Sequence, residues 1–189
     1  MDAFLTSAGL VSIAEIGDKT QLLAILLATR FRKPAPILLG ILAATLANHA
    51  LAAFAGHLAA DYLQGRWFHI AVAASFIAMG LWTLVPDKLD DDDAPRRYGG
   101  VFLTTLVAFF LVEMGDKTQL ATAALGARFA NLGAVIAGTT TGMMIADGPA
   151  VFLGHALVRR ISLKAVRVIA AISFVAVGVW MLAGVLSGG

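Results

Sequence analysis

Two ten-residue stretches place acidic and basic side chains inside otherwise apolar sequence. The first is AEIGDKTQLL, which begins at Ala14, and the second is VEMGDKTQLA, which begins at Val112. Oxygen ligands from Glu, Asp, Gln and Thr suit hard cations such as Ca²⁺, Mg²⁺ and Mn²⁺. Carboxylates held close together also repel each other, so protons compete with a metal ion for the same oxygens. The stretches therefore predict a site at which a divalent cation exchanges with protons.

The candidate metal ligands are the acids and amides of both stretches: Glu15, Asp18, Gln21, Glu113, Asp116 and Gln119. Supporting roles are expected for nearby polar residues and for two residues elsewhere in the chain: Lys19, Thr20, Lys117, Thr118, Asn48 and Asp147. On a continuous helix, Glu15 and Asp18 would share one face, and Lys19 would lie where it can pair with Glu15. Four carboxylates and two ammonium groups sum to −2, the complement of one divalent cation.

Other interpretations of these residues stay open. The Glu and Lys residues could form internal pairs while the Asp residues cap broken helices, which would be a purely structural role. Asn48 and Asp147 could add ligands, form a proton path or make only a helix-packing hydrogen bond. His49 could titrate near neutral pH, although a satisfied buried histidine is the more common finding.

The surrounding composition is that of a membrane protein. Hydrophobic residues make up 59% of the 189 residues, charged residues 14%, and the mean hydropathy is +0.85. The apolar runs are long enough to cross a bilayer and lack the alternation of barrel strands, so we expect α-helices. The predicted fold is all-α, with six transmembrane helices at Ala3–Thr29, Ala35–Ala60, Phe68–Val85, Val101–Ala127, Leu132–Val158 and Val168–Leu186.

The two halves of the chain are duplicates. Glu113 follows Glu15 by 98 residues, and the same offset pairs many other residues, including Trp82 with Trp180. Each half contains three predicted spans, an odd number, so the two repeats should be inverted relative to each other. Many secondary transporters have this architecture, with the substrate site near the bilayer midplane at interrupted helices. Gly17, in the middle of a long span, marks a tilt, a kink or an unwound turn.

The expected organisation is repeat 1 over residues 1–85, an acidic cytoplasmic linker over residues 86–100, and repeat 2 over residues 101–189. The run Asp90–Asp93 in the linker is more typical of a solvated loop than of a cation-collecting patch. Most Lys and Arg residues follow the first, third and fifth spans, which predicts that both termini face outward. The absence of cysteine excludes disulfides and thiolate metal sites.

The paired motif resembles the E-x-G-D-K/R-T/S signature of small cation/proton exchangers in Golgi, chloroplast and bacterial membranes, including bacterial manganese exporters. The motif copies are Glu15-Ile16-Gly17-Asp18-Lys19-Thr20 and Glu113-Met114-Gly115-Asp116-Lys117-Thr118. The resemblance covers nearly the whole chain and implies transport of Mn²⁺, Ca²⁺ or both against protons. It also implies that the motif carboxylates, Glu15, Asp18, Glu113 and Asp116, are the metal ligands.

We therefore expect a proton-coupled antiporter that exports Mn²⁺, with Ca²⁺ as a second candidate, across a bacterial inner membrane. Its expected partners are the divalent cation, protons and the lipid bilayer, with no nucleic acid and no tightly bound cofactor. An enzyme is not expected, because metalloprotease patterns such as H-E-x-x-H are absent. The alternative is an exporter of basic or zwitterionic amino acids, which could also use facing carboxylates.

Overall fold

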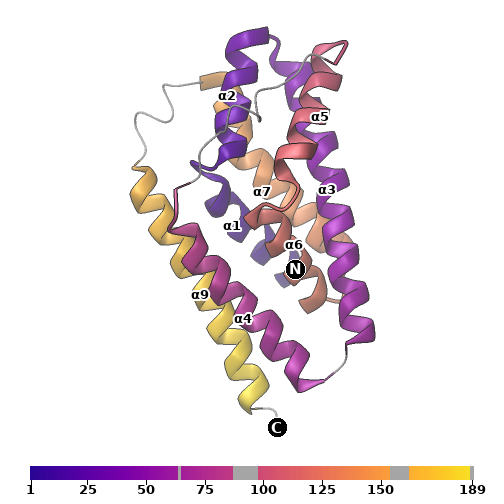
Figure 1. Ribbon diagram of the computed structural model, residues 1–189, viewed down its shortest axis with the longest axis vertical. Coiled ribbons are helices and arrows are strands. Elements are labelled where there is room, and N and C mark those ends of the chain that lie inside the picture. The colour runs from indigo at the N-terminus through magenta and orange to yellow at the C-terminus, as the bar shows by residue number, and fades with distance from the viewer. Residues whose placement is uncertain (64, 87–97, 154–161, 188–189) are drawn as a thin grey trace.

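The computed structural model describes residues 1–63, 65–86, 98–153 and 162–187. The described residues form helices and no strand, which confirms the all-α fold class. The run Asp90–Asp93 and the end of the predicted fifth span lie outside them. The described helices, shown in Figure 1, are α1 (Asp2–Glu15), α2 (Lys19–Phe31), α3 (Pro34–Tyr62), α4 (Arg66–Thr83), α5 (Val101–Glu113), α6 (Lys117–Arg128), α7 (Leu132–Leu153) and α9 (Leu163–Ser187).

Both motif copies interrupt a helix. The first copy separates α1 from α2, and the second separates α5 from α6. The glycine of each copy has a positive φ, +85° at Gly17 and +79° at Gly115, a conformation that side chains with a Cβ rarely adopt. Each motif copy is therefore an unwound turn. The continuous helix that would place Glu15 and Asp18 on one face, with Lys19 beside Glu15, is not formed.

Two of the described helices, α3 and α9, are each long and apolar enough to cross a membrane. The interrupted pairs consist of shorter helices, with 14 and 13 residues in α1 and α2, and 13 and 12 residues in α5 and α6. A single spanning helix needs about 20 residues. Any crossing by an interrupted pair therefore needs both of its helices together.

The long helices α3 and α7 pack against the interrupted helices and so hold the motif copies in place. The first, α3, packs on α5 and α6, while α7 packs on α1 and α2, and α4 and α9 form a separate pair along one side (Figure 1). Glycines allow two of these close approaches. A Cβ at Gly138 on α7 would lie 2.6 Å from the Phe4 carbonyl oxygen of α1, and one at Gly40 on α3 would lie 2.9 Å from the Phe102 carbonyl oxygen of α5.

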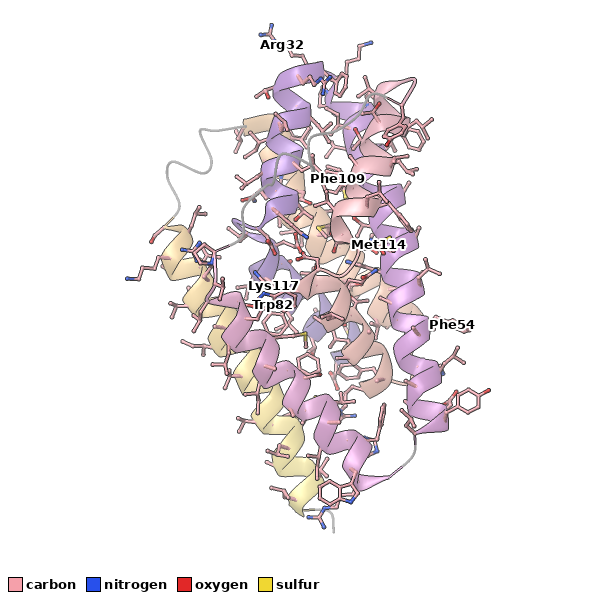
Figure 2. All side chains as sticks on the ribbon, in the orientation of Figure 1. Arg32, Phe54, Trp82, Phe109, Met114 and Lys117 are labelled. Carbon is pink, nitrogen blue, oxygen red and sulfur yellow. The ribbon has the colours of Figure 1, made fainter. Side chains whose placement is uncertain are left out.

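The two motif copies lie near the middle of the molecule along its long axis. Helix α2 runs from the first copy to the end of the molecule that carries Arg32, and α5 leads from that same end to the second copy (Figures 1 and 2). Met114 and Lys117 of the second copy lie well below Arg32 in this view (Figure 2). The fold therefore brings the polar residues of both copies to one level, away from either end.

Candidate cation site

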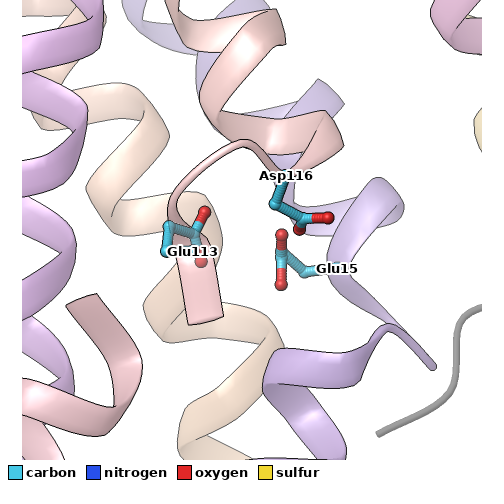
Figure 3. A group of neighbouring side chains, drawn as sticks. All are labelled: Glu15, Glu113 and Asp116. Carbon is cyan, nitrogen blue, oxygen red and sulfur yellow. The ribbon is translucent and has the colours of Figure 1, made fainter. Parts of the chain in front are cut away.

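Three carboxylates from the two motif copies converge at the helix breaks. Glu15 ends α1, Glu113 ends α5, and Asp116 is the N-cap residue of α6. Each offers an oxygen that lies within 4.8 Å of the other two (Figure 3). Their exposed fractions are 0%, 2% and 3%. Because buried carboxylates need a compensating charge, this group has the ligand chemistry and the electrostatics of a cation site.

The threonine of each copy holds the glutamate of its own copy. The hydroxyl of Thr20 donates to Glu15 Oε2, and that of Thr118 donates to Glu113 Oε1 at 2.6 Å. Among the described residues, the other oxygen of each glutamate has no hydrogen-bond partner. Each glutamate therefore keeps one oxygen available for a cation.

The two motif aspartates differ in their surroundings. Asp18 Oδ1 accepts the Lys19 main-chain N–H at 2.7 Å and so caps α2, whereas Asp116 makes no such side-chain cap at α6. Asp18 is also buried, with 4% of its surface exposed. The structure therefore brings Asp116 into the three-carboxylate cluster, while Asp18 is engaged at the start of α2.

Lys19 connects the two copies instead of pairing within its own. Its ammonium group lies 3.6 Å from Asp116 Oδ1, while 21% of the Lys19 side chain is exposed. The expected pairing of Lys19 with Glu15 is wrong, because the helix ends between the two residues and the i,i+4 geometry is lost. The ammonium group offsets part of the negative charge of the cluster from outside the three carboxylates.

Lys117, the equivalent lysine of the second copy, is almost fully buried, with 3% exposed. Its ammonium nitrogen lies 5.6 Å from the centre of the Trp82 ring, within the range of a cation–π interaction, and the two side chains are neighbours in Figure 2. Trp82 belongs to α4, so this contact joins the α4–α9 pair to the motif region.

The motif glutamines brace the unwound turns. In each copy the glutamine Oε1 accepts the main-chain N–H of the motif glycine, at 2.9 Å for Gln21 and 2.6 Å for Gln119. The amide nitrogen of Gln21 donates to the Ala146 carbonyl of α7 at 3.0 Å, and that of Gln119 donates to Asn48 Oδ1 of α3 at 2.5 Å. The glutamine oxygens thus hold the turns in this arrangement, and their coordination of a cation stays a prediction.

Helices α3 and α7 add three polar residues around the cluster. His49 is fully buried and its Nε2 lies 3.4 Å from Glu113 Oε1, a partner that neither interpretation of this histidine predicts. The signal that could have pointed to it is its 98-residue offset from Asp147. Asn48 also donates to the Phe110 carbonyl at 3.1 Å. Asp147 is completely buried.

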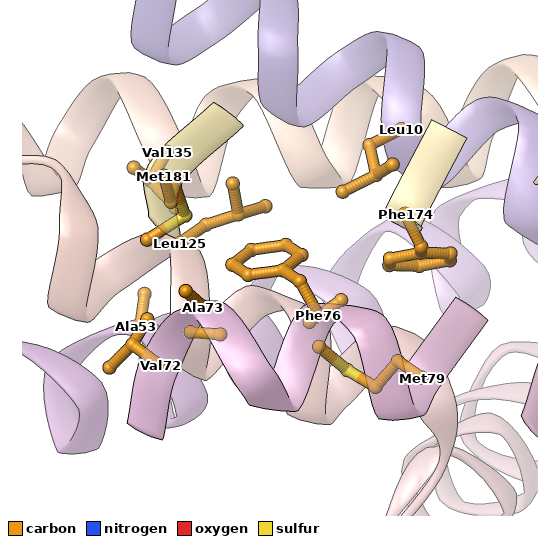
Figure 4. Packing of buried hydrophobic residues seen from close by; sticks show 12 residues of the cluster. Leu10, Ala53, Val72, Ala73, Phe76, Met79, Leu125, Val135, Phe174 and Met181 are labelled. Carbon is orange, nitrogen blue, oxygen red and sulfur yellow. The ribbon is translucent and has the colours of Figure 1, made fainter. Parts of the chain in front are cut away.

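Apolar side chains close the space on both sides of the carboxylates. The Arg32-side cluster consists of Leu23, Ala24, Ile25, Leu27, Ile37, Ile41, Ala44, Ala108, Phe109, Val112, Ala150 and Val151. The opposite cluster consists of Leu10, Ala53, Val72, Ala73, Phe76, Met79, Ala121, Ala124, Leu125, Val135, Phe174 and Met181 (Figure 4). In the opposite cluster, the rings of Phe76 on α4 and Phe174 on α9 have centroids 6.3 Å apart. The carboxylates therefore lie between two apolar clusters, one toward each end of the molecule.

Comparison with known proteins gives the family. The model of the family described as divalent cation/proton antiporter GDT1 matches residues 3–91 and 101–188. The chain is 46% identical, over 90% of its length and 86% of the relative's, to a protein of Vibrio cholerae serotype O1 named "Putative manganese exporter". It is 29% identical to GDT1-like protein 5 of Arabidopsis thaliana, over 96% of both chains. It is also 29% identical to the GDT1-like protein sll0615 of Synechocystis, over 92% of the chain and 93% of the relative.

No solved structure matches the chain. The family model covers nearly the entire sequence, and it includes both motif copies and the polar residues of α3 and α7. The chain therefore belongs to the GDT1 family of divalent cation/proton antiporters.

Proposed function

We propose that this protein exports Mn²⁺ from the cytoplasm in exchange for protons, with Ca²⁺ as a second candidate cargo. The observation that carries the proposal is the buried group of Glu15, Glu113 and Asp116, to which both motif copies contribute. Carboxylate oxygens suit Mn²⁺ and Ca²⁺, and a carboxylate must lose its proton to bind either ion. The name of the Vibrio cholerae relative favours Mn²⁺.

The exchange cycle uses competition for the same oxygens. A cation that arrives from the cytoplasm displaces protons from the three carboxylates, and the site then opens toward the other side of the membrane. Protons moving inward displace the cation, and the protonated site returns. The apolar clusters on either side keep water and ions from crossing freely while the site is closed. Because the cation is cargo, this cycle needs no tightly bound cofactor.

We further propose that six membrane crossings form two inverted three-helix repeats in a bacterial inner membrane, with both termini outside. The interrupted pairs α1–α2 and α5–α6 would each make one crossing. Reciprocal packing supports the repeat: Gly40 contacts α5 as Gly138, 98 residues later, contacts α1. The two separate matches of the family model, one in each half, support it as well. Arg32 and its basic neighbours would mark the cytoplasmic end.

We propose that Asp18, Gln21 and Gln119 bind the cation in other steps of the cycle than the arrangement described. In the arrangement described, Asp18 caps α2 and the glutamine oxygens accept main-chain N–H groups. We assign these oxygens to steps of the cycle in which the unwound turns rearrange and release them to the cation. Lys19 would then limit repulsion among the carboxylates whenever the cation is absent.

The test is Mn²⁺ flux into proteoliposomes under an imposed pH gradient, for the wild type and Glu113→Gln, with Ca²⁺ and lysine as competitors. Gradient-dependent Mn²⁺ flux that the substitution abolishes is the expected result. The matched control is Asp61→Asn, which removes a carboxylate whose side chain is 63% exposed on α3 and should leave flux unchanged. If folded protein moved neither Mn²⁺ nor Ca²⁺, the metal function would be wrong, and gradient-dependent flux of lysine would favour the amino-acid exporter.

A further inference from the structure

Asp147 is a carboxylate whose burial the three-carboxylate cluster does not explain. It lies on α7, its exposed fraction is 0%, and neither of its oxygens has a hydrogen-bond partner among the described residues. Burying a charged or polar group without a partner is strongly unfavourable in a protein interior and more so at membrane depth. The free-energy cost of burying Asp147 without a partner would be offset if its carboxylate bound a ligand during function.

Asp147 lies beside the cluster. The preceding residue, Ala146, accepts a hydrogen bond from Gln21 at 3.0 Å, so this turn of α7 is fixed against the first motif copy. Asp147 is close enough to Glu113 and Glu15 for their carboxylates to repel one another. Its counterpart at the 98-residue offset, His49, contacts Glu113 from α3. Equivalent positions of α3 and α7 therefore flank the same centre.

A proton alone would satisfy Asp147 poorly. It would remove the charge, but it would engage only one of the two oxygens, and neither oxygen has a hydrogen-bond partner among the described residues. A divalent cation would neutralise the charge and engage the oxygens at once. Ca²⁺ takes six to eight oxygen ligands, more than the three carboxylates of the cluster supply with one oxygen each, so a further carboxylate fits a hard cation of this kind.

We propose that Asp147 is a fourth carboxylate ligand of the transported divalent cation, supplied by α7 from outside the duplicated motif. The inference rests on the proposed function, since the ligand is the cargo itself. The two repeats would then contribute different groups at equivalent positions, a carboxylate from Asp147 on α7 and an imidazole from His49 on α3.

The absence of native cysteine allows a direct test. Asp147→Cys would place a thiolate at this position, and thiolates prefer soft cations such as Cd²⁺. The purified full chain would be titrated with Cd²⁺ while the ultraviolet charge-transfer absorption of a cadmium–thiolate bond is recorded. The expected result is an absorption band in Asp147→Cys that Mn²⁺ competes away. The control, Asp61→Cys on the exposed part of α3, should show no Mn²⁺-sensitive band.

A second variant measures the contribution to the native cargo. Asp147→Asn should weaken Mn²⁺ binding by about tenfold or more, since loss of residues that merely orient metal ligands already costs about 10- to 100-fold. Its thermal unfolding in the absence of metal should match or exceed that of the wild type, because a buried unpaired charge is gone. A cadmium-silent Asp147→Cys together with wild-type Mn²⁺ affinity in Asp147→Asn would overturn the inference while leaving the proposed function intact. Loss of Mn²⁺ flux and binding in the wild type itself would instead overturn the proposed function.

Discussion

Replacement of Thr118 by valine tests whether the motif threonines prepare the glutamates for the cation. The substitution keeps the size and shape of the side chain and all the charges of the site, and it removes only the hydroxyl that donates to Glu113 Oε1 at 2.6 Å. Without it, a buried carboxylate loses its fixed orientation. The cation must then order that carboxylate when it binds, so we expect weaker binding.

Two independent estimates of the free energy lost on removal of the Thr118 hydroxyl agree. Hydrogen bonds to charged groups contribute about 1.5–3 kcal/mol. Loss of groups that orient metal ligands lowers metal affinity by about 10- to 100-fold, which corresponds to about 1.4–2.7 kcal/mol. We therefore expect the Kd for Mn²⁺ of Thr118→Val to rise by about 10- to 100-fold. Thr20→Val should have a similar effect, because Thr20 holds Glu15 in the same way.

The assay is equilibrium Mn²⁺ binding to the purified protein at fixed pH, with electron paramagnetic resonance reporting the free ion. The control is Thr139→Val, which removes an equally buried threonine hydroxyl whose partners are the Val135 and Ile136 carbonyls on its own helix. That variant should bind Mn²⁺ as the wild type does. Wild-type affinity in both Thr20→Val and Thr118→Val would refute the idea that these hydroxyls prepare the site.

Two further predictions concern the turns and the lysine that joins them. Gly17→Ala and Gly115→Ala should each lower the free energy of unfolding by about 1–2 kcal/mol, the cost of a left-handed conformation. The two losses should be similar, because nothing lies within 4 Å of a Cβ at Gly115, and the atom nearest a Cβ at Gly17 is Leu163 Cδ2, the end of a flexible side chain that can move aside. Chemical denaturation measures both, and no loss in either variant would contradict the backbone argument. Lys19→Gln should tighten Mn²⁺ binding about fivefold, since the ion pair with Asp116 is partly exposed and worth at most about 1 kcal/mol. Unchanged or weaker binding in the same titration would show that Lys19 does not compete with the cation.

Residue type and repetition were enough to predict that carboxylates of the two motif copies lie together. Glu15, Glu113 and Asp116 were predicted because acids are rare in apolar sequence, and because the duplication indicated that both copies act together. Long uninterrupted helices were also predictable: α3 at Pro34–Tyr62 encloses the predicted span Ala35–Ala60. Acids within apolar sequence and long apolar runs can both be identified from the residue types alone.

Contacts that depend on the unwound turns could not be predicted in the same way. Lys19 was expected beside Glu15 because a helix was assumed, but the positive φ at Gly17 redirects the chain and Lys19 reaches Asp116 of the other repeat. The contact of His49 with Glu113 joins α3 to α5, and only the packing of those helices determines it. Sequence spacing describes neighbours along one element and says little about neighbours across two.

The two helix breaks make each interrupted segment a pair of short rods joined by a hinge. At the first break the hinge is Ile16-Gly17-Asp18, with Glu15 immediately before it and Lys19 immediately after it. A swing of α2 against α1 would leave both rods intact, yet it would change the distances between groups that face the cation. The second hinge is Met114-Gly115-Asp116, with Glu113 immediately before it and Lys117 immediately after it. If the proposed site binds the cation, a change of angle at either break would at the same time change how tightly the cation is held.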